Sequence, residues 1–589
     1  MEHSPLKGAE FLIRPTDVNS VFTPEDFNDE HRQIRDTTND FVVNEVLPKV
    51  ELIDDHGYET VKELMKQCGE LGLLMTDAPE AFGGLELDKV TSMIVAESIA
   101  RTGSFSVAFT AHTGIGTLPL VYYGTKEQKE QYLEKLITGE WIAAYCLTEP
   151  GSGSDALAVS STAVLDGDHY VLNGTKQFIT NGGIADFFTI FVKIDMEHFT
   201  AFLVERTCAG LRIGPEEKKM GIRGSSTTQV IMDNVRVPKG NLLGQIGKGH
   251  KIAFNILNIG RLKLGACVNG AAKQAILPAI EYAKDRKQFG QPIAKFGAIQ
   301  QKFAERMAEL YAAESLVYRL AGVIDQRFAR LDKGAEDYYQ QQESNLADYG
   351  AECAISKVYC SEMLQRLVDE VVQIHGGYGF LEEYPAERFY RDERINRIYE
   401  GTNEINRLLI PGTILKKSLK GELPLQPAAM AAFESLMSPN FDELEDTPFA
   451  AEMKVVEDCK QVFLILSGAA VQRFGHKLAN EQEILLASAD IAIQVYAMES
   501  AVLRSAKVFA KASANKQALY QAMTTLTVFN SVENISRAAK SAAFSIEEGD
   551  NLTLILSGIR RYTKYNATGL LEAKRLIAKE TLDQGKYPL

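Results

Sequence analysis

The chain has 589 residues, of which 45% are apolar and 24% charged, and its formal net charge is −15. This length exceeds what one hydrophobic core usually serves, and the composition is not that of a disordered chain, so we expect several packed domains. The acidic balance argues against nucleic acid as the main partner, because phosphate binding depends on clustered Lys and Arg.

The cysteines, the N-terminus and the apolar runs indicate the compartment of the protein. The seven cysteines are scattered and never spaced as CxxC, which predicts neither a disulfide framework nor a zinc site. Residues 1–15 lack both the apolar core of a secretory signal and the composition of a transit peptide. The apolar run Val462–Val471 is about half of the roughly 20 residues that a spanning helix needs. We therefore expect a cytoplasmic protein without a transmembrane segment.

The first two predicted domains differ in the period of their apolar residues. Helical spacing predicts an N-terminal helical domain over residues 25–146. From 147 to 249, β-branched and aromatic residues separated by turn dipeptides predict an antiparallel β-domain. The expected turns are Asp166-Gly167, Asn173-Gly174, Asn181-Gly182 and Asp233-Asn234.

Helical spacing returns in the second half of the chain. It predicts a helical bundle over residues 250–415 and, after a connection at Asp442–Pro448, an additional helical domain over 440–589. The predicted fold class is therefore a multidomain α+β protein with one β-domain between helical domains.

Two segments near the β-domain could carry a site. Tyr145–Asp155 leads into Gly151-x-Gly153-x-x-Ala156, which matches a dinucleotide-binding fingerprint. That fingerprint requires a helix to follow, whereas strands are predicted here, so we reject the match. A functional loop and an ordinary polar loop both stay open. Asn173–Gly183 is explained by a simple hairpin.

Two further segments lie in the predicted bundle. Arg391–Glu404 places the carboxylate of Glu400 beside a glycine between helical stretches, where a solvated or capping acid is the simpler interpretation. Gln373–Phe380 is a glycine-rich break that could merely reverse the chain. Its His375 has no second His or Cys at ligand spacing, so we predict no metal site.

Together, in order and spacing, these four segments resemble the signature stretches of the acyl-CoA dehydrogenase family over roughly residues 25–415. Tyr145–Asp155 resembles the first signature, and Gln373-Ile-His-Gly-Gly with Tyr399-Glu-Gly-Thr-Asn-Glu-Ile resembles the second. The additional C-terminal helices make the chain similar to the very-long-chain branch. The resemblance implies an FAD-dependent dehydrogenation of fatty acyl-CoA in β-oxidation, with a preference for long chains. It also implies a homodimer and an electron-transferring flavoprotein as acceptor.

The resemblance also assigns residues. It makes Glu400 the base that removes the α-proton, with its backbone N–H on the thioester oxygen. The implied FAD contacts are Tyr145, Leu147, Thr148, Ser154, Phe178 and Thr180, together with Gln373, Gly376, Gly377, Thr402 and Glu404, and with Arg286 and Phe289 acting on the FAD of the other subunit. The implied acyl-CoA contacts are Ser154, Asn258, Arg261 and Gly401. Phe178 replaces a tryptophan common in the family, and Gly297 stands where many members carry Gln.

The sequence leaves other functions open. An acyl-CoA oxidase would share the base and flavin, and a non-catalytic scaffold of the same fold would keep the flavin without turnover. A DNA-binding relative is disfavoured because basic and acidic residues balance in the last domain. The basic amphipathic stretch with Arg504, Lys507, Lys511 and Lys516 is either a peripheral membrane contact or the solvated face of a packed helix. Thr117 is small enough to leave a deep acyl pocket open.

Overall fold

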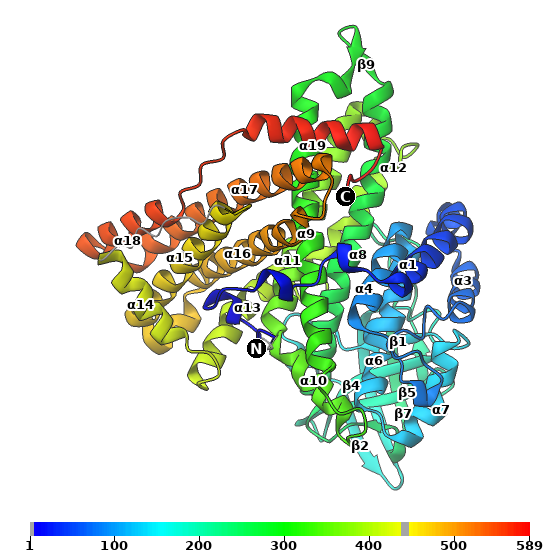
Figure 1. Cartoon of the computed structure of the whole chain (residues 1–589). Coiled ribbons are helices and arrows are strands. Elements are labelled where there is room, and N and C mark those ends of the chain that lie inside the picture. The colour runs from blue at the N-terminus through cyan, green and yellow to red at the C-terminus, as the bar shows by residue number, and fades with distance from the viewer. Residues whose placement is uncertain (1–4, 438–446) are drawn as a thin grey trace.

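The computed structural model describes residues 5–437 and 447–589. Figure 1 shows the large β-sheet at the lower right, long central helices, and a further group of helices on the left. The N-terminal region is helical, as predicted, and its α7 begins with a capping box in which Thr125 and Gln128 bond reciprocally. Its main helices are α1 (Asp29–Phe41), α2 (Val50–Asp54), α3 (Tyr58–Glu70), α4 (Lys89–Ile99), α5 (Ser104–Thr110), α6 (Leu118–Tyr123) and α7 (Lys126–Ile137).

The β-domain is one eight-stranded sheet with the order β6-β7-β3-β2-β4-β5-β8, and β1 pairs with β4. The predicted β-domain is present, but β4 pairs in parallel with both β1 and β2, so the sheet is mixed rather than wholly antiparallel. The sheet also begins four residues before residue 147. Its strands are β1 (Ala143–Cys146), β2 (Thr162–Asp166), β3 (His169–Thr180), β4 (Phe187–Ile194), β5 (His198–Glu205), β6 (Leu211–Ile213), β7 (Thr227–Pro238) and β8 (Leu242–Leu243).

Two of the four predicted turns are wrong. Asp166-Gly167 does join β2 to β3, and Asn181-Gly182 does follow β3. Asn173-Gly174 lies inside β3 instead, and Asp233-Asn234 lies inside β7. The pairing of β3 with β7 is irregular between Leu172 and Gly174, and the N–H of Asn234 donates to the Asn173 side-chain oxygen over 2.9 Å. The two dipeptides thus face each other across a β-bulge.

The central bundle is built around α8 (Gly249–Asp285), which packs along α11 and against α4. At about 1.5 Å per residue, its 37 residues span about 55 Å, which is long enough to connect the two ends of the bundle. A short hairpin of β9 (Lys287–Gln288) and β10 (Gln291–Pro292) extends beyond its end. The other helices are α9 (Gly297–Phe328), α10 (Tyr338–Asp348), α11 (Gly350–His375), α12 (Pro385–Glu393) and α13 (Asn403–Leu419).

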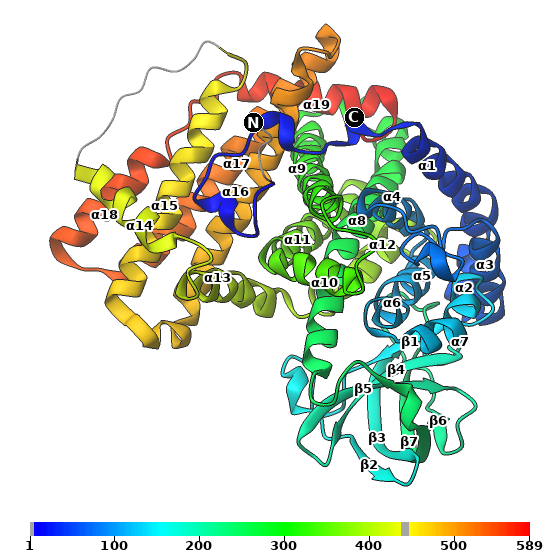
Figure 2. The ribbon, with the colours of Figure 1, turned by 60° about the horizontal axis from the view of Figure 1, so that its bottom comes forward.

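The additional C-terminal region is helical, as predicted, and Figure 2 shows it beside the central bundle. An unpredicted helix, α14 (Leu425–Met437), precedes the expected connection, of which residues 442–446 lie outside the described residues. α16 is long and apolar enough to be a candidate membrane span, but 78% of that window is buried, as in the core helix of a bundle. The remaining helices are α15 (Ala450–Phe474), α16 (Gln482–Phe509), α17 (Ala514–Ile546), α18 (Gly549–Tyr562) and α19 (Leu570–Gln584).

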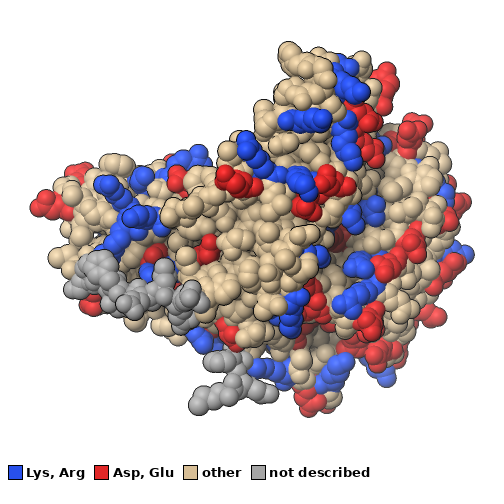
Figure 3. Space-filling view, turned by 45° about the horizontal axis from the view of Figure 1, so that its top comes forward, with Lys and Arg blue, Asp and Glu red and all other residues tan. Residues whose placement is uncertain are grey.

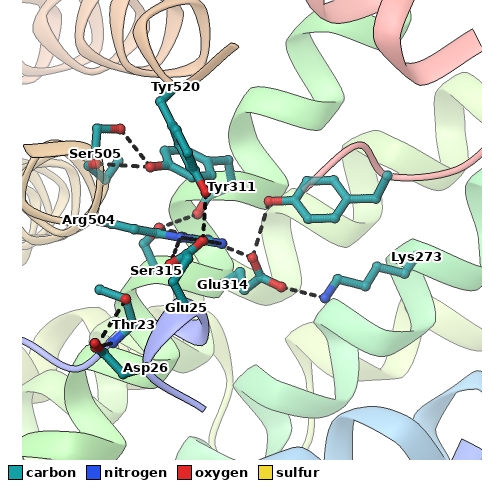
Figure 4. A network of polar contacts seen from close by, with 12 residues as sticks. Thr23, Glu25, Asp26, Lys273, Tyr311, Glu314, Ser315, Arg504, Ser505 and Tyr520 are labelled. Atoms are coloured by element: carbon teal, nitrogen blue, oxygen red, sulfur yellow. Dashed lines mark hydrogen bonds and ion pairs between the residues drawn. The ribbon is translucent and has the colours of Figure 1, made fainter. Parts of the chain in front are cut away.

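The basic stretch of α16 does not form a membrane-facing surface. Arg504 is 1% exposed and pairs with Glu25 over 2.7 Å and with Glu314 over 2.6 Å. Figure 4 shows this network, in which Arg504 lies between an N-terminal carboxylate and a carboxylate of α9. Lys507 bonds Asp26 over 2.5 Å. Arg504 and Lys507 therefore join the domains rather than face a membrane, whereas Lys511 and Lys516 lie beyond α16 and are exposed.

The distribution of surface charge also argues against a membrane-binding face. On the face shown in Figure 3, Lys and Arg side chains are interspersed with Asp and Glu rather than gathered into a patch of one sign. Such a face offers no concentrated field for a polyanion or an anionic membrane.

Candidate active site

Glu400 lies in a tight turn between a short 3₁₀ segment, Arg394–Arg397, and the start of α13. Glu400 has a φ of 58° and Gly401 a φ of 80°. The left-handed conformation is unfavourable for a residue with a side chain and tends to persist where the surroundings enforce it, often at functional sites. The side chain of Thr402 caps α13 by accepting a hydrogen bond from the N–H of Ile405 over 3.2 Å.

Three buried side chains hold the carbonyl groups of this turn. The Nε of Arg261 donates to the carbonyl oxygen of Glu400 over 3.1 Å, and the Nζ of Lys357 donates to that of Gly401 over 2.8 Å. The side-chain amide of Asn406 donates to the same Gly401 oxygen over 2.8 Å. The backbone N–H of Glu400 has no acceptor within the described parts of the chain. The turn is therefore fixed through its carbonyls, with one N–H left available.

One oxygen of the Glu400 carboxylate, Oε2, is removed from water. A Cβ built at Gly260 of α8 would lie 2.7 Å from its Oε2, so a glycine there leaves the carboxylate its space. Oε2 is buried and has no hydrogen-bond partner. Burial raises the pKa of Glu400 to about 7, although the charges of Arg261 and Lys357 act in the opposite direction.

A cavity starts at this carboxylate and follows α8. Its lining includes five α8 residues, at successive spacings of four, three, four and three: Gly260, Leu264, Cys267, Ala271 and Gln274. This spacing is that of one helix face, so the cavity runs along α8 for about 21 Å at 1.5 Å per residue. Val107, Ala111, Gly114 and Ile115 form part of the opposite wall. The middle of the cavity is therefore mainly apolar, although Ser106, Thr110 and Lys263, which pairs with Asp77 over 2.7 Å, also belong to the lining.

The sequence prediction about Thr117 is wrong. Thr117 is buried but does not line the cavity, whereas Gly114 and Ala111, about one and two helical turns earlier, do. The helix is interrupted here by a π-helical stretch, Ala111–Gly116, which changes the face that each side chain presents. The small residues that leave the cavity open are thus Ala111 and Gly114.

The β-domain contributes the end of β3. Thr180 lines the cavity that holds Glu400, and Phe178 is 62% exposed with a φ of 56°. Of the first-loop residues, Tyr145 and Leu147 have buried side chains, while Ser154 is exposed. A buried pair anchors this loop: the Nζ of Lys176 donates to Glu149 over 2.6 Å and to the carbonyl of Leu147 over 3.3 Å.

A second group of predicted cofactor residues lies at the far end of α8. Arg286, Gly376 and Gly377 line one groove there. A Cβ at either glycine would meet nothing within 4 Å. Phe289, in the β9–β10 hairpin, is 93% exposed and has a φ of 52°. The helix rise places this end of α8 about 38 Å from Gly260. The structure therefore divides the predicted cofactor residues into two separate groups.

The other predicted residues take structural positions. Asn258 accepts a hydrogen bond from Arg261 over 2.8 Å, and both side chains are buried. Gln373 and Glu404 are exposed. His375 bonds the carbonyl of Val371 over 2.7 Å. In residues 5–437 and 447–589, no group of three His, Cys, Asp or Glu side chains could hold a metal ion.

Sequence reasoning missed the residues that support the turn. Lys357 and Asn406 hold its carbonyls, and neither belongs to a signature stretch that the prediction used. The signal for Lys357 was its place in the apolar run Ala354–Cys360 of α11, because a lysine in a buried helix needs a partner. Nothing near Asn406 in the sequence indicated that its amide would reach backwards to Gly401.

Comparison with known proteins agrees with this architecture. Four family models match: the acyl-CoA dehydrogenase N-terminal domain at residues 28–140, the middle domain at 144–235, and two C-terminal domain models at 247–415 and 458–561. A probable acyl-CoA dehydrogenase of Bacillus subtilis is 48% identical over 585 residues, which cover 99% of this chain and 98% of the relative. A Bacillus anthracis acyl-CoA dehydrogenase complexed with FAD has a TM-score of 0.97 at 48% identity, and the match covers 99% of this chain and 100% of that one.

The chain therefore belongs to the acyl-CoA dehydrogenase family, whose members are FAD-dependent oxidoreductases. It has an additional C-terminal domain, matched at residues 458–561, and is similar to the very-long-chain branch of the family. The mitochondrial very long-chain specific acyl-CoA dehydrogenase of Bos taurus is 37% identical over 502 residues, covering 80% of this chain and 72% of that protein.

Proposed function

We propose that this protein oxidises long-chain fatty acyl-CoA to the trans-2-enoyl thioester, with Glu400 as the base and FAD as the hydride acceptor. The observation that carries the proposal is the unpartnered Glu400 carboxylate at the start of an apolar cavity. A carboxylate with a pKa of about 7 is half ionised at neutral pH, which suits a base that must accept a proton and later release it.

The chain's own residues would prepare the substrate as follows. The thioester carbonyl oxygen would accept a hydrogen bond from the free backbone N–H of Glu400, and this bond would make the α-proton more acidic. Arg261, Lys357 and Asn406 would keep that N–H and the carboxylate in place by holding the carbonyls of the turn. The α-proton would pass to the carboxylate of Glu400 in a site from which the acyl chain has expelled water.

The residues present fit FAD. Phe178, two residues before the cavity-lining Thr180, exposes an aromatic ring against which the planar flavin ring could stack. Thr180 lies beside it, and the loop anchored by Lys176 and Glu149 flanks both. When bound, FAD supplies the acceptor for the hydride of the β-carbon, a role that no side chain can fill.

The second group of residues supports a homodimer. Arg286 has no ion-pair partner among the described residues, and the open glycines beside it leave room for a phosphate-bearing group. This group lies too far along α8 to serve the same cofactor as Glu400 in one subunit, so it would serve the FAD of a second subunit. Mass photometry should give the mass of two chains, and a tetrameric mass would contradict this proposal.

The cavity length supports a long acyl chain. An extended chain advances about 1.2 Å per bond, so the 21 Å along α8 would take about 17 bonds. Medium-length acyl groups would leave much of this apolar surface unfilled.

The test follows flavin absorbance and peroxide together while the air-equilibrated protein is mixed with acyl-CoAs of rising length. Bleaching by long acyl-CoAs with little peroxide is the expected result, with an electron-transferring flavoprotein then restoring the colour. Peroxide in each turnover would mark an oxidase instead. Glu400→Gln should keep FAD and lose activity by a factor of about 10² or more. A flavoprotein that no acyl-CoA bleaches would overturn the proposal.

A further inference from the structure

The far end of the acyl cavity is polar, in contrast to its middle. Arg101 and Gln274 line it there, and Oδ2 of Asp392 lies 3.6 Å from a Cβ built at Gly103, two residues from Arg101. Glu393 and Asn396 also belong to the cavity lining. The Nε of Arg101 donates to the side-chain oxygen of Gln274 over 3.0 Å, which places the guanidinium level with the last cavity-lining turn of α8. A cavity that only receives the methyl end of a fatty acyl chain gains nothing from a charge at this point.

Arg101 has no anionic partner within the described parts of the chain. Its two hydrogen bonds go to neutral amide oxygens, those of Gln274 and of Asn39 over 3.1 Å. A guanidinium carries five N–H donors, so three are left over. Burial lowers the pKa of Arg101, and no acidic neighbour offsets this effect. The cation is therefore partly desolvated without compensation.

The two acids at this end contact other groups, although Oε2 of Glu393 is buried without a hydrogen-bond partner, and burial raises the pKa of Asp392 to about 6 and that of Glu393 to about 7. Glu393 accepts a hydrogen bond from Arg397 over 3.3 Å, and Asp392 accepts one from the N–H of Ile222 over 2.5 Å. The charges of Arg388 and Arg391 also act on Asp392. These arginines belong to α12 and the segment after it, and Arg101 forms an ion pair with neither acid.

We propose that Arg101 binds an ω-carboxylate, so that the enzyme accepts CoA monothioesters of long α,ω-dicarboxylic acids. Guanidinium and carboxylate match in shape and form two parallel charge-assisted hydrogen bonds. Arg101 and Gln274 are half-buried, so the cavity end approaches the surface and a charged terminus reaches it without losing all its water. The length along α8 places that carboxylate at Arg101 when the acyl chain has about sixteen carbons.

This inference rests on the proposed function, and the experiment separates the two. The purified holoenzyme is assayed with palmitoyl-CoA, hexadecanedioyl-CoA and decanedioyl-CoA. We expect kcat/KM for hexadecanedioyl-CoA to equal or exceed that for palmitoyl-CoA. Decanedioyl-CoA should be poor, because its carboxylate would stop in the apolar middle of the cavity. A tenfold or greater preference for palmitoyl-CoA over hexadecanedioyl-CoA would overturn the inference and leave the proposed function intact.

A variant gives an independent readout. Arg101→Met keeps a long side chain without the charge, and it should lower the ratio of kcat/KM for hexadecanedioyl-CoA to that for palmitoyl-CoA by about tenfold or more. Arg32→Met, an exposed arginine of α1 paired with Asp29, is the matched control and should change neither value. Equal losses with both substrates would show that Arg101 has a structural role only. No activity with any of the three thioesters would defeat the proposed function itself.

Discussion

Arg504 offers the sharpest test of how the domains are held together. It donates to both carboxylate oxygens of Glu25, each over 3.0 Å from Nε, and to Glu314 over 2.6 Å. Arg504→Met keeps the length of the side chain and removes the charge. Glu25 then keeps only the hydroxyl of Tyr520 over 3.0 Å, whereas Glu314 keeps Lys273 over 2.5 Å. Glu25 therefore becomes the unpaired group.

The size of the effect follows from burial. Removing one partner of a buried ion pair costs about 3–5 kcal/mol. Because the side chain of Glu25 is 28% exposed and Glu314 keeps a partner, we expect the lower limit, about 3 kcal/mol. That corresponds to an increase of about 150-fold in the population in which the N-terminal segment has detached. Hydrogen exchange of residues 18–27 should accelerate by about this factor.

Lys507→Met is the matched control on the same helix. Its pair with Asp26 is 20% and 31% exposed, so its loss should cost about 1 kcal/mol or less. The double variant Arg504→Met/Glu25→Gln should recover part of the loss, since it leaves no unpaired carboxylate in the segment. Equal exchange rates in Arg504→Met and Lys507→Met would refute the reasoning.

Three further predictions concern the site. First, kcat/KM should fall as pH drops below about 7, because protonated Glu400 cannot accept the α-proton, and Glu400→Gln should lose this limb; a pH profile flat down to pH 5 would contradict the assignment. Second, Lys357→Met removes a charge that lowers the pKa of Glu400, so the acid limb of the pH profile should move to higher pH; a move to lower pH would contradict this electrostatic role of Lys357. Third, Ala111→Phe should reduce kcat/KM for palmitoyl-CoA about tenfold or more and spare short acyl-CoAs, because the ring narrows the cavity; equal losses at all lengths would argue against it.

Local patterns in the chain were sufficient for its broad organisation. The change from helical to alternating apolar spacing located the β-domain, and helical spacing predicted the additional C-terminal helices, because these periods follow from backbone geometry. The resemblance singled out Glu400, and the structure places it at the start of a cavity. Its role as base stays a prediction.

Long-range contacts decided the rest. The parallel pairing of β1 with β4, the bulge that replaces two expected turns, and the burial of Arg504 all depend on partners far away in sequence. A dipeptide such as Asn173-Gly174 permits a turn or a bulge, and only the opposing strand selects between them. Likewise a basic stretch looks the same whether it faces solvent or a buried carboxylate. The sequence determined which elements form, and tertiary packing determined which charges and backbone groups are left without a partner, because that depends on what each one meets.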